Sequence, residues 1–324
     1  MLTPSDNNKN HQKNPDSLVR WRELRAKYQA HVISLISHPM TPAFFDLSKV
    51  FPEADDLPTL LDQLDDLKNC LDSFRPLNPA QVRNLQGAWD IEYTYESNRI
   101  EGNTLTLQET GLVISEGITI GGKRLNEHLE AINHKEAIDY IRELANGQSE
   151  LNEYTLNSIH ALILRGIDQE NAGKYRAVPV TISGAKHVPP QPFLVPKLME
   201  DLFVFYGNEK STLHPVQLAA EMHERLVNIH PYVDGNGRTS RLLMNLILLQ
   251  HGYPIANISA DQRIAYYNAL EKAQVGGDAS DFHRLVARTE KASLFKYLEM
   301  VSGNVGDDAE GKGLYFFERI KGYL

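Results

Sequence analysis

Residues 230–241 have the sequence HPYVDGNGRTSR, and this stretch decides how the rest of the chain is interpreted. An apolar helical segment ends at its histidine, a glycine-rich turn follows, and another apolar helix begins at once. The glycines around Asn236 free the backbone to point its N–H groups inward, and the new helix adds unpaired N–H groups and the positive end of its dipole. The sequence therefore predicts an anion-binding turn between two helices.

The side chains of this turn add reactive groups to the anion site. Arg238 and Arg241 are three residues apart, so both lie on one face of the first helical turn and can contact a polyphosphate. Asp234 is the kind of carboxylate that holds Mg²⁺ while phosphates complete the coordination shell. His230 supplies a base that titrates near neutrality and can take a proton from an attacking hydroxyl. The combination predicts group transfer from a nucleoside triphosphate to an alcohol.

Helical spacing of apolar residues extends over most of the chain, which predicts an all-α fold. Leucines recur every three or four residues between positions 57 and 71, as on one face of an amphipathic helix. Thr106 and Glu109 form a potential capping box. Gly147 is placed to end a helix that begins near Leu125, and Gly166 to end the next. Further helices are expected at 78–102, 156–163, 198–206, 215–229, 236–250, 259–274 and 280–300, then a loop at 303–313 and a short terminal helix.

One segment has the spacing of strands instead. Val178, Val180 and Ile182 alternate with small or polar residues, and the residues SGAK at 183–186 offer a turn before His187. This pattern predicts a short β-hairpin. Prolines on its second arm cannot donate backbone hydrogen bonds, so one edge should stay open.

Length and charge set broader limits. A chain of 324 residues favours one large core with an appendage. We expect a disordered leader at 1–15, an N-terminal helical extension at 16–77, a core at 78–302 and a tail at 303–324. The chain has 33 Lys+Arg and 42 Asp+Glu, a net charge of −9, so no overall positive field attracts nucleic acid or anionic lipid.

Several kinds of site and location are disfavoured. Cys70 is the only cysteine, which excludes an intramolecular disulfide and any multi-cysteine metal site. No apolar run approaches the roughly 20 residues of a membrane helix, and the polar N-terminus lacks a secretory signal. These features predict a cytoplasmic protein. The chain has no GxxxxGK[ST] or GxGxxG loop, and the HExxH pattern that His223 and Glu224 begin fails at Val227.

The stretch at 230–241 resembles the signature of the Fic family, H-x-F-x-[D/E]-G-N-G-R-x-x-R. It differs at one specified position, where Tyr232 replaces phenylalanine and its hydroxyl needs a partner. The resemblance extends from about 78 to 302. It implies an all-α core with a β-hairpin flap at 173–192, called here the flap segment, after an N-terminal helical extension. The implied activity is transfer of AMP from ATP to a Ser, Thr or Tyr hydroxyl of a target protein, with release of pyrophosphate.

The resemblance also implies roles for particular residues. His230 would be the general base, Asp234 the Mg²⁺ ligand, and Arg238 and Arg241 would hold the phosphates. The anion hole would be Gly235, Asn236 and Gly237. The open edge of the flap would bind the target's backbone, through Val180, Ile182, Ser183, Gly184 and His187. The adenine pocket would include Tyr266, Tyr267 and Gln274, although asparagine is common where Gln274 stands, and core packing explains either tyrosine equally well.

A second motif precedes the core. Residues 97–102, SNRIEG, are similar to the family's inhibitory element [S/T]-x-x-x-E-[G/N], in the class that carries it before the catalytic core. The resemblance implies that Ser97 and Glu101 are autoinhibitory, because a Glu101 carboxylate paired with Arg241 takes the guanidinium that the γ-phosphate needs. In some family members the same glutamate supports removal of AMP from the target.

The sequence leaves alternatives open. A Fic-type transferase can use another donor, such as phosphate, phosphocholine or UMP, or can act in the de-AMPylating direction. A non-catalytic adaptor that binds a nucleotide or a peptide strand is the interpretation from a different class, and the intact His230 argues against it. The residues after 302 are too few and too weakly basic for a DNA-binding winged helix. Self-modification and a homodimer are compatible with the resemblance, but no sequence feature requires either.

Overall fold

The computed structural model describes residues 15–36, 45–77, 79–303 and 310–324, and every regular element in these ranges is a helix. The all-α prediction is therefore confirmed for this part of the chain. Contacts divide the chain into two compact units, residues 1–85 with 291–324 and residues 86–290. Residues 1–14 of the predicted leader lie outside the described residues, and its last residue begins α1 (Pro15–Ile36).

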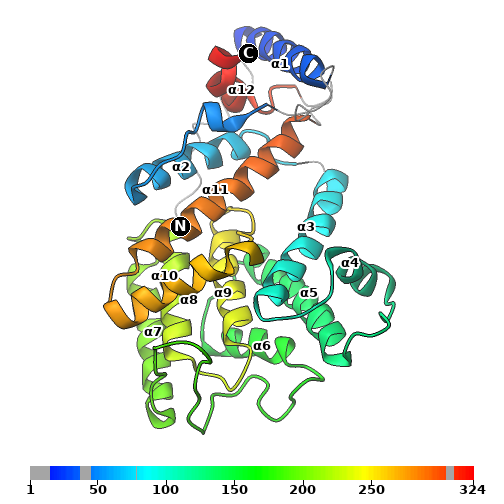
Figure 1. The fold of residues 1–324 in the computed structure, drawn as a ribbon. Coiled ribbons are helices and arrows are strands. Elements are labelled where there is room, and N and C mark those ends of the chain that lie inside the picture. Colours follow the sequence, from blue (N-terminus) through cyan, green and yellow to red (C-terminus); the bar gives the residue numbers. More distant parts are fainter. Residues whose placement is uncertain (1–14, 37–44, 78, 304–309) are drawn as a thin grey trace. The chain divides into compact units, whose positions relative to one another are not determined.

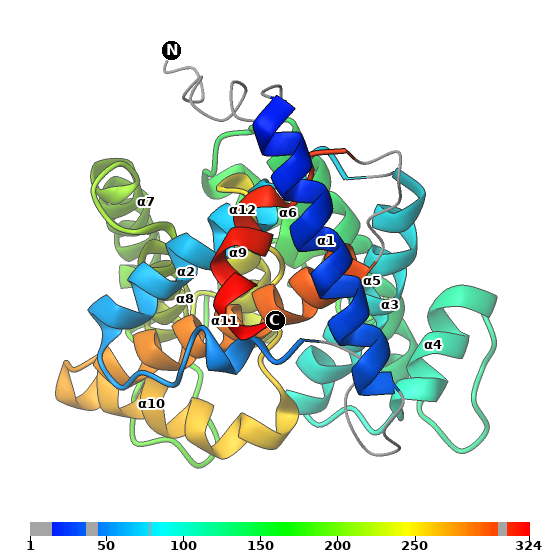
Figure 2. The same ribbon diagram turned by 90° about the horizontal axis from the view of Figure 1, so that it is seen from above.

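The first unit is built around aromatic and leucine side chains. It contains α1, η2 (Leu47–Lys49), α2 (Leu57–Asp72), α12 (Leu314–Ile320) and η5 (Lys321–Tyr323). Figure 2 shows α12 between α1 and α2, both of which it contacts. The predicted leucine stripe of α2 is buried at Leu60, Leu64, Leu67 and Leu71. Rings of α1 and α12 meet in the core of this unit, among them Tyr28, Phe316 and Phe317.

The second unit surrounds one buried helix. Its elements are α4 (Leu107–Glu116), α5 (Leu125–Asn146), α6 (Glu153–Ile163), η3 (Pro192–Leu194), α7 (Val195–Glu209), α8 (Pro215–Ile229), α9 (Asn236–Gln250), η4 (Ala260–Gln262) and α10 (Arg263–Gly276). Figure 1 shows α9 in the middle of this unit, and α9 contacts α5, α6 and α8. Every residue from Arg238 to Leu248 is buried, as expected for a helix enclosed by others.

Two helices belong to both units. α3 (Pro79–Ile100) and α11 (Ser280–Gly303) each run from one unit into the other along the chain. The predicted start of α3 at Asn78 lies outside the described residues. Its end is at Ile100 rather than Gly102, so Glu101 directly follows the last helical residue. The predicted loop after α11 falls partly on residues 304–309, which are also outside the described ranges.

Local signals set several helix ends as predicted. Thr106 Oγ1 accepts a hydrogen bond from the Glu109 N–H (3.2 Å), and Glu109 Oε2 accepts one from the Thr106 N–H (2.8 Å), which is a complete capping box. Gly147 caps α5. The predicted bounds of α8 and α9 are confirmed at both ends. α10 begins at Arg263, four residues later than predicted, because Ser259 caps the short 3-10 turn η4 instead.

The predicted β-hairpin is wrong, since no strand forms among the residues that the structure describes. The turn is present: the Ala185 N–H donates to Ile182 O (3.2 Å), and Gly184 has a φ of 79°. The arms contain bends at 177–178 and 186, and the carbonyls of Val178 and Pro190 accept hydrogen bonds from the Arg176 guanidinium rather than from each other's arm. Prolines on both arms lack the N–H groups that a ladder needs.

The described helices include none that is long and apolar enough to cross a lipid bilayer.

Candidate active site

His230 stands at the end of α8 in a left-handed conformation. Its φ and ψ are 51° and 58°, and its N–H donates to Leu226 O (2.9 Å). Such a conformation costs a residue with a side chain roughly 1–3 kcal/mol, so the surrounding contacts must hold it. The His230 carbonyl accepts a 2.8 Å hydrogen bond from Arg176 Nε. The buried Nδ1 of the imidazole has no hydrogen-bond partner.

The electrostatic environment keeps the His230 imidazole neutral at neutral pH. Burial lowers the pKa of His230 to about 4, and Arg176 and His187 act in the same direction, opposed by a backbone hydrogen bond with Val227 and by the Glu101 carboxylate. Neutral imidazole is the form that accepts a proton. The arrangement therefore provides a base that is already in the required protonation state.

The glycine-rich turn leads directly into α9. Gly235 has a φ of 76°, and a Cβ on it would come within 3.3 Å of His160 Nε2. Asn236 closes the turn, because its Oδ1 accepts from the Tyr232 N–H (3.0 Å) and its Nδ2 donates to Tyr232 O (2.9 Å). A Cβ on Gly237 would collide with Glu101 Oε1. A side chain at Gly235 would be strained by the positive φ, and one at Gly237 would displace the Glu101 carboxylate, so the two glycines leave the N-terminus of α9 approachable.

Asp234 extends from this turn into solvent. Its side chain is 64% exposed, Oδ1 accepts from the Gly235 N–H (2.6 Å), and Oδ2 lies 3.5 Å from Arg238 Nη2. Exposed carboxylate oxygens at a phosphate-binding turn fit the donor set of Mg²⁺, which commonly uses one or two carboxylates and phosphate oxygens. Within the described ranges, no group of three or more His, Cys, Asp and Glu side chains forms a potential metal site. A magnesium ion here would thus depend on Asp234 and on phosphate or water oxygens.

Arg241 is buried beside this turn and fully engaged. Its side chain is 1% exposed; Nε donates to Ser97 Oγ (2.9 Å), and Nη2 donates to Ser97 O (2.8 Å) and Glu101 Oε1 (2.8 Å). Nη1 lies 3.4 Å from the Tyr266 hydroxyl. Burial alone would lower the pKa of Arg241, but Glu101 and Tyr266 outweigh it and the pKa is raised. The Glu101 carboxylate, with its side chain 32% exposed, therefore occupies the solvent-facing side of a permanently charged guanidinium.

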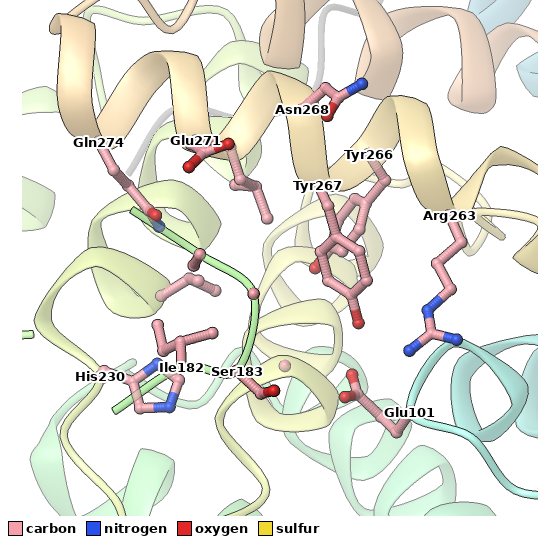
Figure 3. A pocket seen from close by; sticks show the side chains of 15 residues that line it. Glu101, Ile182, Ser183, His230, Arg263, Tyr266, Tyr267, Asn268, Glu271 and Gln274 are labelled. Atoms are coloured by element: carbon pink, nitrogen blue, oxygen red, sulfur yellow. The ribbon is translucent and has the colours of Figure 1, made fainter. Parts of the chain in front are cut away.

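A cavity of about 310 Å³ opens next to these groups. Figure 3 shows α10 on one side of it, with Tyr267 and Gln274 pointing in, and Ser183 of the flap segment opposite. Nine of the residues that the sequence analysis assigned to the site line this cavity: Glu101, Ile182, Ser183, Gly184, His230, Gly237, Tyr266, Tyr267 and Gln274. Gln274 Nε2 is buried without a partner. The volume lies within the range of small-molecule sites.

Other predicted residues lie around this cavity rather than on its wall. Asp234, Gly235, Asn236 and Arg238 belong to the adjoining turn, Ser97 and Arg241 lie behind Glu101, and Val180 and His187 are elsewhere on the flap segment. Arg238 turns away from Arg241, since its guanidinium lies 3.4 Å from Glu130 and 3.5 Å from Asp234. The two arginines that the sequence places on one helical face therefore meet different carboxylates.

Sequence reasoning missed several residues that shape the site. His160 stacks on Tyr232 with a centroid distance of 3.6 Å, accepts from the Gly173 N–H at Nδ1 (2.9 Å) and donates from Nε2 to Asp234 O (2.9 Å). The Tyr232 hydroxyl donates to Asn157 Oδ1 (2.8 Å). A lone histidine in an amphipathic helix carries no local signal, so only the fold reveals these contacts.

The cavity also contains residues of α10 that no motif indicated, among them Arg263, Asn268 and Glu271. His223, which begins the incomplete HExxH pattern, is fully buried, and its Nε2 lies 3.1 Å from the Tyr266 hydroxyl. It therefore supports Tyr266 from the core, and through Tyr266 it lies behind Arg241.

Comparison with known proteins identifies relatives of this chain. The model of the Fic/DOC family matches residues 150–248, from just before α6 almost to the end of α9. Protein adenylyltransferase Fic from Drosophila grimshawi is 33% identical over 300 residues, which are 88% of this chain and 61% of that protein. The chain thus spans less than two thirds of the length of that relative.

Solved structures share the fold. A Fic domain containing signaling protein from Bacteroides thetaiotaomicron superposes with a TM-score of 0.69 at 29% identity, over 75% of this chain and 98% of that chain. Fic-1 from C. elegans superposes with a TM-score of 0.66 at 30% identity, over 75% of this chain and 72% of that chain. Over three quarters of this chain, the helical arrangement is thus shared with these structures.

Proposed function

This chain belongs to the Fic/DOC family, and from that premise we propose that it is a protein adenylyltransferase. It transfers AMP from ATP to a Ser, Thr or Tyr hydroxyl of a target protein and releases pyrophosphate. The observation that carries the proposal is the meeting of His230, Gly237 and Glu101 on one cavity wall, with the Arg241 guanidinium directly behind Glu101. A base, an anion-binding turn and a buried cation are the groups that such a transfer requires.

Each residue of the turn has a separate role in the proposed transfer. The target's hydroxyl oxygen attacks the α-phosphorus, its proton passes to His230, and the bond from the α-phosphorus to the bridging oxygen of pyrophosphate breaks. Backbone N–H groups of the anion hole, Gly235, Asn236 and Gly237, face the phosphates at the start of α9. Arg238 and Arg241 bind the phosphates after their carboxylate partners are displaced. Asp234 holds Mg²⁺, which neutralises charge on the phosphates when bound.

The cavity wall offers places for the other two reactants. Tyr267, which is 40% exposed, and Gln274, whose buried Nε2 lacks a partner, support an adenine pocket together with the more deeply buried Tyr266. The flap segment would bind the target's backbone near the cavity. Its contributing residues would be Val180, Ile182, Ser183, Gly184 and His187. Val178 and Val188 on the same segment are more than half exposed, which supports a docking role.

We also propose that Glu101 inhibits the enzyme, with Ser97 holding the guanidinium in place for it. Glu101 and a γ-phosphate cannot share Arg241 cheaply, because both are anions. The 2.8 Å contact and the burial of Arg241 favour the inhibited arrangement. Holding the active arrangement at about 1% of molecules requires only about 2.7 kcal/mol. The alternative role for the same carboxylate is support of de-AMPylation.

The family resemblance also suggests a role for each part of the chain. Residues 16–77 would form the N-terminal extension, 78–302 the catalytic domain and 303–324 a tail. A cytoplasmic location, a homodimer and self-modification complete the proposal, and they rest on the sequence and the family resemblance alone.

A label-transfer experiment tests the function. Glu101→Gly protein is incubated with Mg²⁺ and ATP labelled at the α-phosphate or at the γ-phosphate, and protein-bound label is counted on the chain itself and on candidate targets. We expect label from the α-position only. We expect it to rise at least roughly tenfold over wild type, because a population held near 1% is released, and to vanish in the His230→Ala double variant.

Each other outcome points to a stated alternative. Label from the γ-position alone would replace adenylyl transfer with phosphate transfer. No label from either position, with ATP still bound, would favour the adaptor interpretation. Equal labelling by wild type and Glu101→Gly would reject inhibition by Glu101 but leave the proposed adenylyltransferase activity intact. Faster loss of AMP from pre-labelled protein in wild type than in Glu101→Gly would assign Glu101 to de-AMPylation.

A further inference from the structure

The flap segment lacks the ladder of a hairpin, so its position depends on side chains. Arg176, near its start, makes the contacts that bring its two arms together. Arg176 Nη1 donates to Val178 O (3.2 Å) on the first arm, and Nη2 donates to Pro190 O (2.5 Å) on the second. One guanidinium thus replaces the cross-strand hydrogen bonds that the prolines prevent.

The same guanidinium reaches the reaction centre. Arg176 Nε donates to the carbonyl of His230 (2.8 Å), and the Arg176 N–H donates to Pro231 O (2.9 Å). His230 has a left-handed backbone, in which the direction of its carbonyl and that of its side chain are fixed together. A donor that holds this carbonyl therefore also holds the direction of the Cα–Cβ bond from which the imidazole enters the cavity.

Arg176 is unusual in its surroundings. Arg176 is only 3% exposed. Among the described residues, no carboxylate lies within ion-pair distance of its guanidinium. Its contacts are carbonyls from three separate places in the chain. A buried arginine that binds only backbone carbonyls fixes those segments relative to one another without adding a charged pair to the site.

The other anchors of the flap segment do not touch His230. Glu271 Oε1 of α10 accepts from the Lys186 N–H (2.8 Å) at the tip, and His187 Nε2 donates to Asn228 O (2.9 Å). These contacts hold the tip near α8 and α10. The link between the arms of the flap and the backbone of His230 runs through Arg176.

We propose that Arg176 is a positioning residue that ties the flap segment to His230, so that the surface that docks the target and the base that deprotonates its hydroxyl keep one fixed geometry. This inference rests on the proposed function. It predicts that loss of Arg176 affects the rate of AMP transfer but not the binding of ATP. Loss of the guanidinium slows transfer of AMP, because the hydroxyl no longer meets His230 correctly, whereas ATP still binds through α9 and α10.

The test uses the full chain with Glu101→Gly as the parent. Two variants of Arg176 are made in it: Arg176→Met removes the donors, and Arg176→Lys keeps the charge but cannot span three carbonyls. Arg165→Met is the matched control, because Arg165 is half exposed on the same unit and pairs with Glu136 outside the cavity. Single-turnover self-labelling with α-labelled ATP gives the maximal rate and the ATP concentration for half-saturation. Hydrogen exchange reports the amides of 180–188.

We expect the maximal rate to fall on the order of 100-fold in Arg176→Met and less in Arg176→Lys, with half-saturation by ATP unchanged. Exchange at 180–188 should become roughly tenfold faster in Arg176→Met only. An unchanged rate, or a fall in rate matched by the Arg165→Met control, would overturn the proposal. So would exchange that rises equally over the whole unit in both Arg176 variants, since that means a general loss of stability.

The readouts separate the two proposals. If the parent transfers no label to itself or to any candidate target, the proposed function fails, and exchange at 180–188 still decides whether Arg176 holds the flap segment. If the parent is active and exchange is unchanged in Arg176→Met, only the role of Arg176 fails.

Discussion

At the scale of single residues, Tyr232 is the position where this chain departs from its family's signature, and the structure supplies the partner that its hydroxyl needs. The ring stacks on His160, and the hydroxyl donates to Asn157 Oδ1 (2.8 Å). The residue is completely buried. Tyrosine is therefore tolerated because α6 brings an amide oxygen to the point where a phenylalanine ring would end.

Tyr232→Phe should lower the free energy of unfolding by about 1 kcal/mol, because it leaves Asn157 Oδ1 without its donor. Label transfer should change little, since the ring stack is kept. Urea denaturation measures the first effect. In a double-mutant cycle with Asn157→Ala the two losses should not add; full additivity would mean that the hydrogen bond contributes nothing.

His230 makes stability depend on pH. Its pKa is about 4 in the folded chain and about 6.5 when unfolded. Between these values the unfolded chain binds a proton that the folded chain does not, so the free energy of unfolding decreases as pH falls from 6.5 towards 4. His160, whose pKa burial also lowers to about 4, acts with the same sign.

We expect wild-type protein to lose stability between about pH 7 and pH 5, by up to about 1.4 kcal/mol per pH unit for each fully displaced histidine. His230→Asn should lose less over the same interval, because one of these histidines is gone. Urea denaturation at the two pH values measures both differences. Equal losses in the two proteins would show that His230 does not have a lowered pKa.

At the scale of elements, the tip of the flap segment depends on one carboxylate of α10. Glu271 Oε1 accepts from the Lys186 N–H at 2.8 Å, beside the cavity that Glu271 and the flap segment both line. Glu271→Ala should speed hydrogen exchange at Lys186 roughly tenfold, since the amide loses its acceptor. Glu271→Gln is the matched control, because its amide oxygen can still accept. Exchange that is slow in all three proteins would mean that other contacts close the tip.

The helices and the flap segment show what sequence can and cannot predict. Pro215, Gly147 and the Thr106–Glu109 capping box are local signals, and each sets a helix end as expected. Alternation of Val178, Val180 and Ile182 predicts a strand, but this segment forms bends and a turn and no strand. The alternation does not state which group provides the hydrogen bonds, and here a side chain provides them in place of a second strand.

The site residues likewise include some that the sequence predicts and some that it does not. The turn at 230–241 is continuous in sequence, so the residue pattern alone locates its glycines and Asp234. The contact of Glu101 with Arg241 joins residues 140 positions apart, and only the family resemblance pointed to it. Arg176 and His160 had no signal, because each acts through backbone carbonyls or amides that have no counterpart in a residue pattern.

At the scale of the whole molecule, Glu101 stabilises the nucleotide-free chain through its contact with Arg241, and the same contact weakens the binding of nucleotide. Arg241 is buried, and removing Glu101 leaves it with Ser97 and Tyr266 but no counter-charge. Loss of one partner from such a contact costs roughly 1–3 kcal/mol. A ligand that binds only the folded chain returns about 2.7 kcal/mol at a hundredfold excess over its Kd.

Without nucleotide, therefore, Glu101→Gln should unfold at a lower temperature than wild type. With Mg²⁺ and a non-hydrolysable ATP analogue, the variant should gain more than wild type does, because no carboxylate charge competes with the γ-phosphate for Arg241. Scanning calorimetry of both proteins with and without the analogue measures the two shifts. Glu136→Gln, which alters an exposed pair with Arg165, is the control and should show the wild-type gain. If wild type gains as much as Glu101→Gln, Arg241 is not the group for which carboxylate and nucleotide compete, and inhibition by Glu101 would have to act on the orientation of bound ATP instead of its affinity.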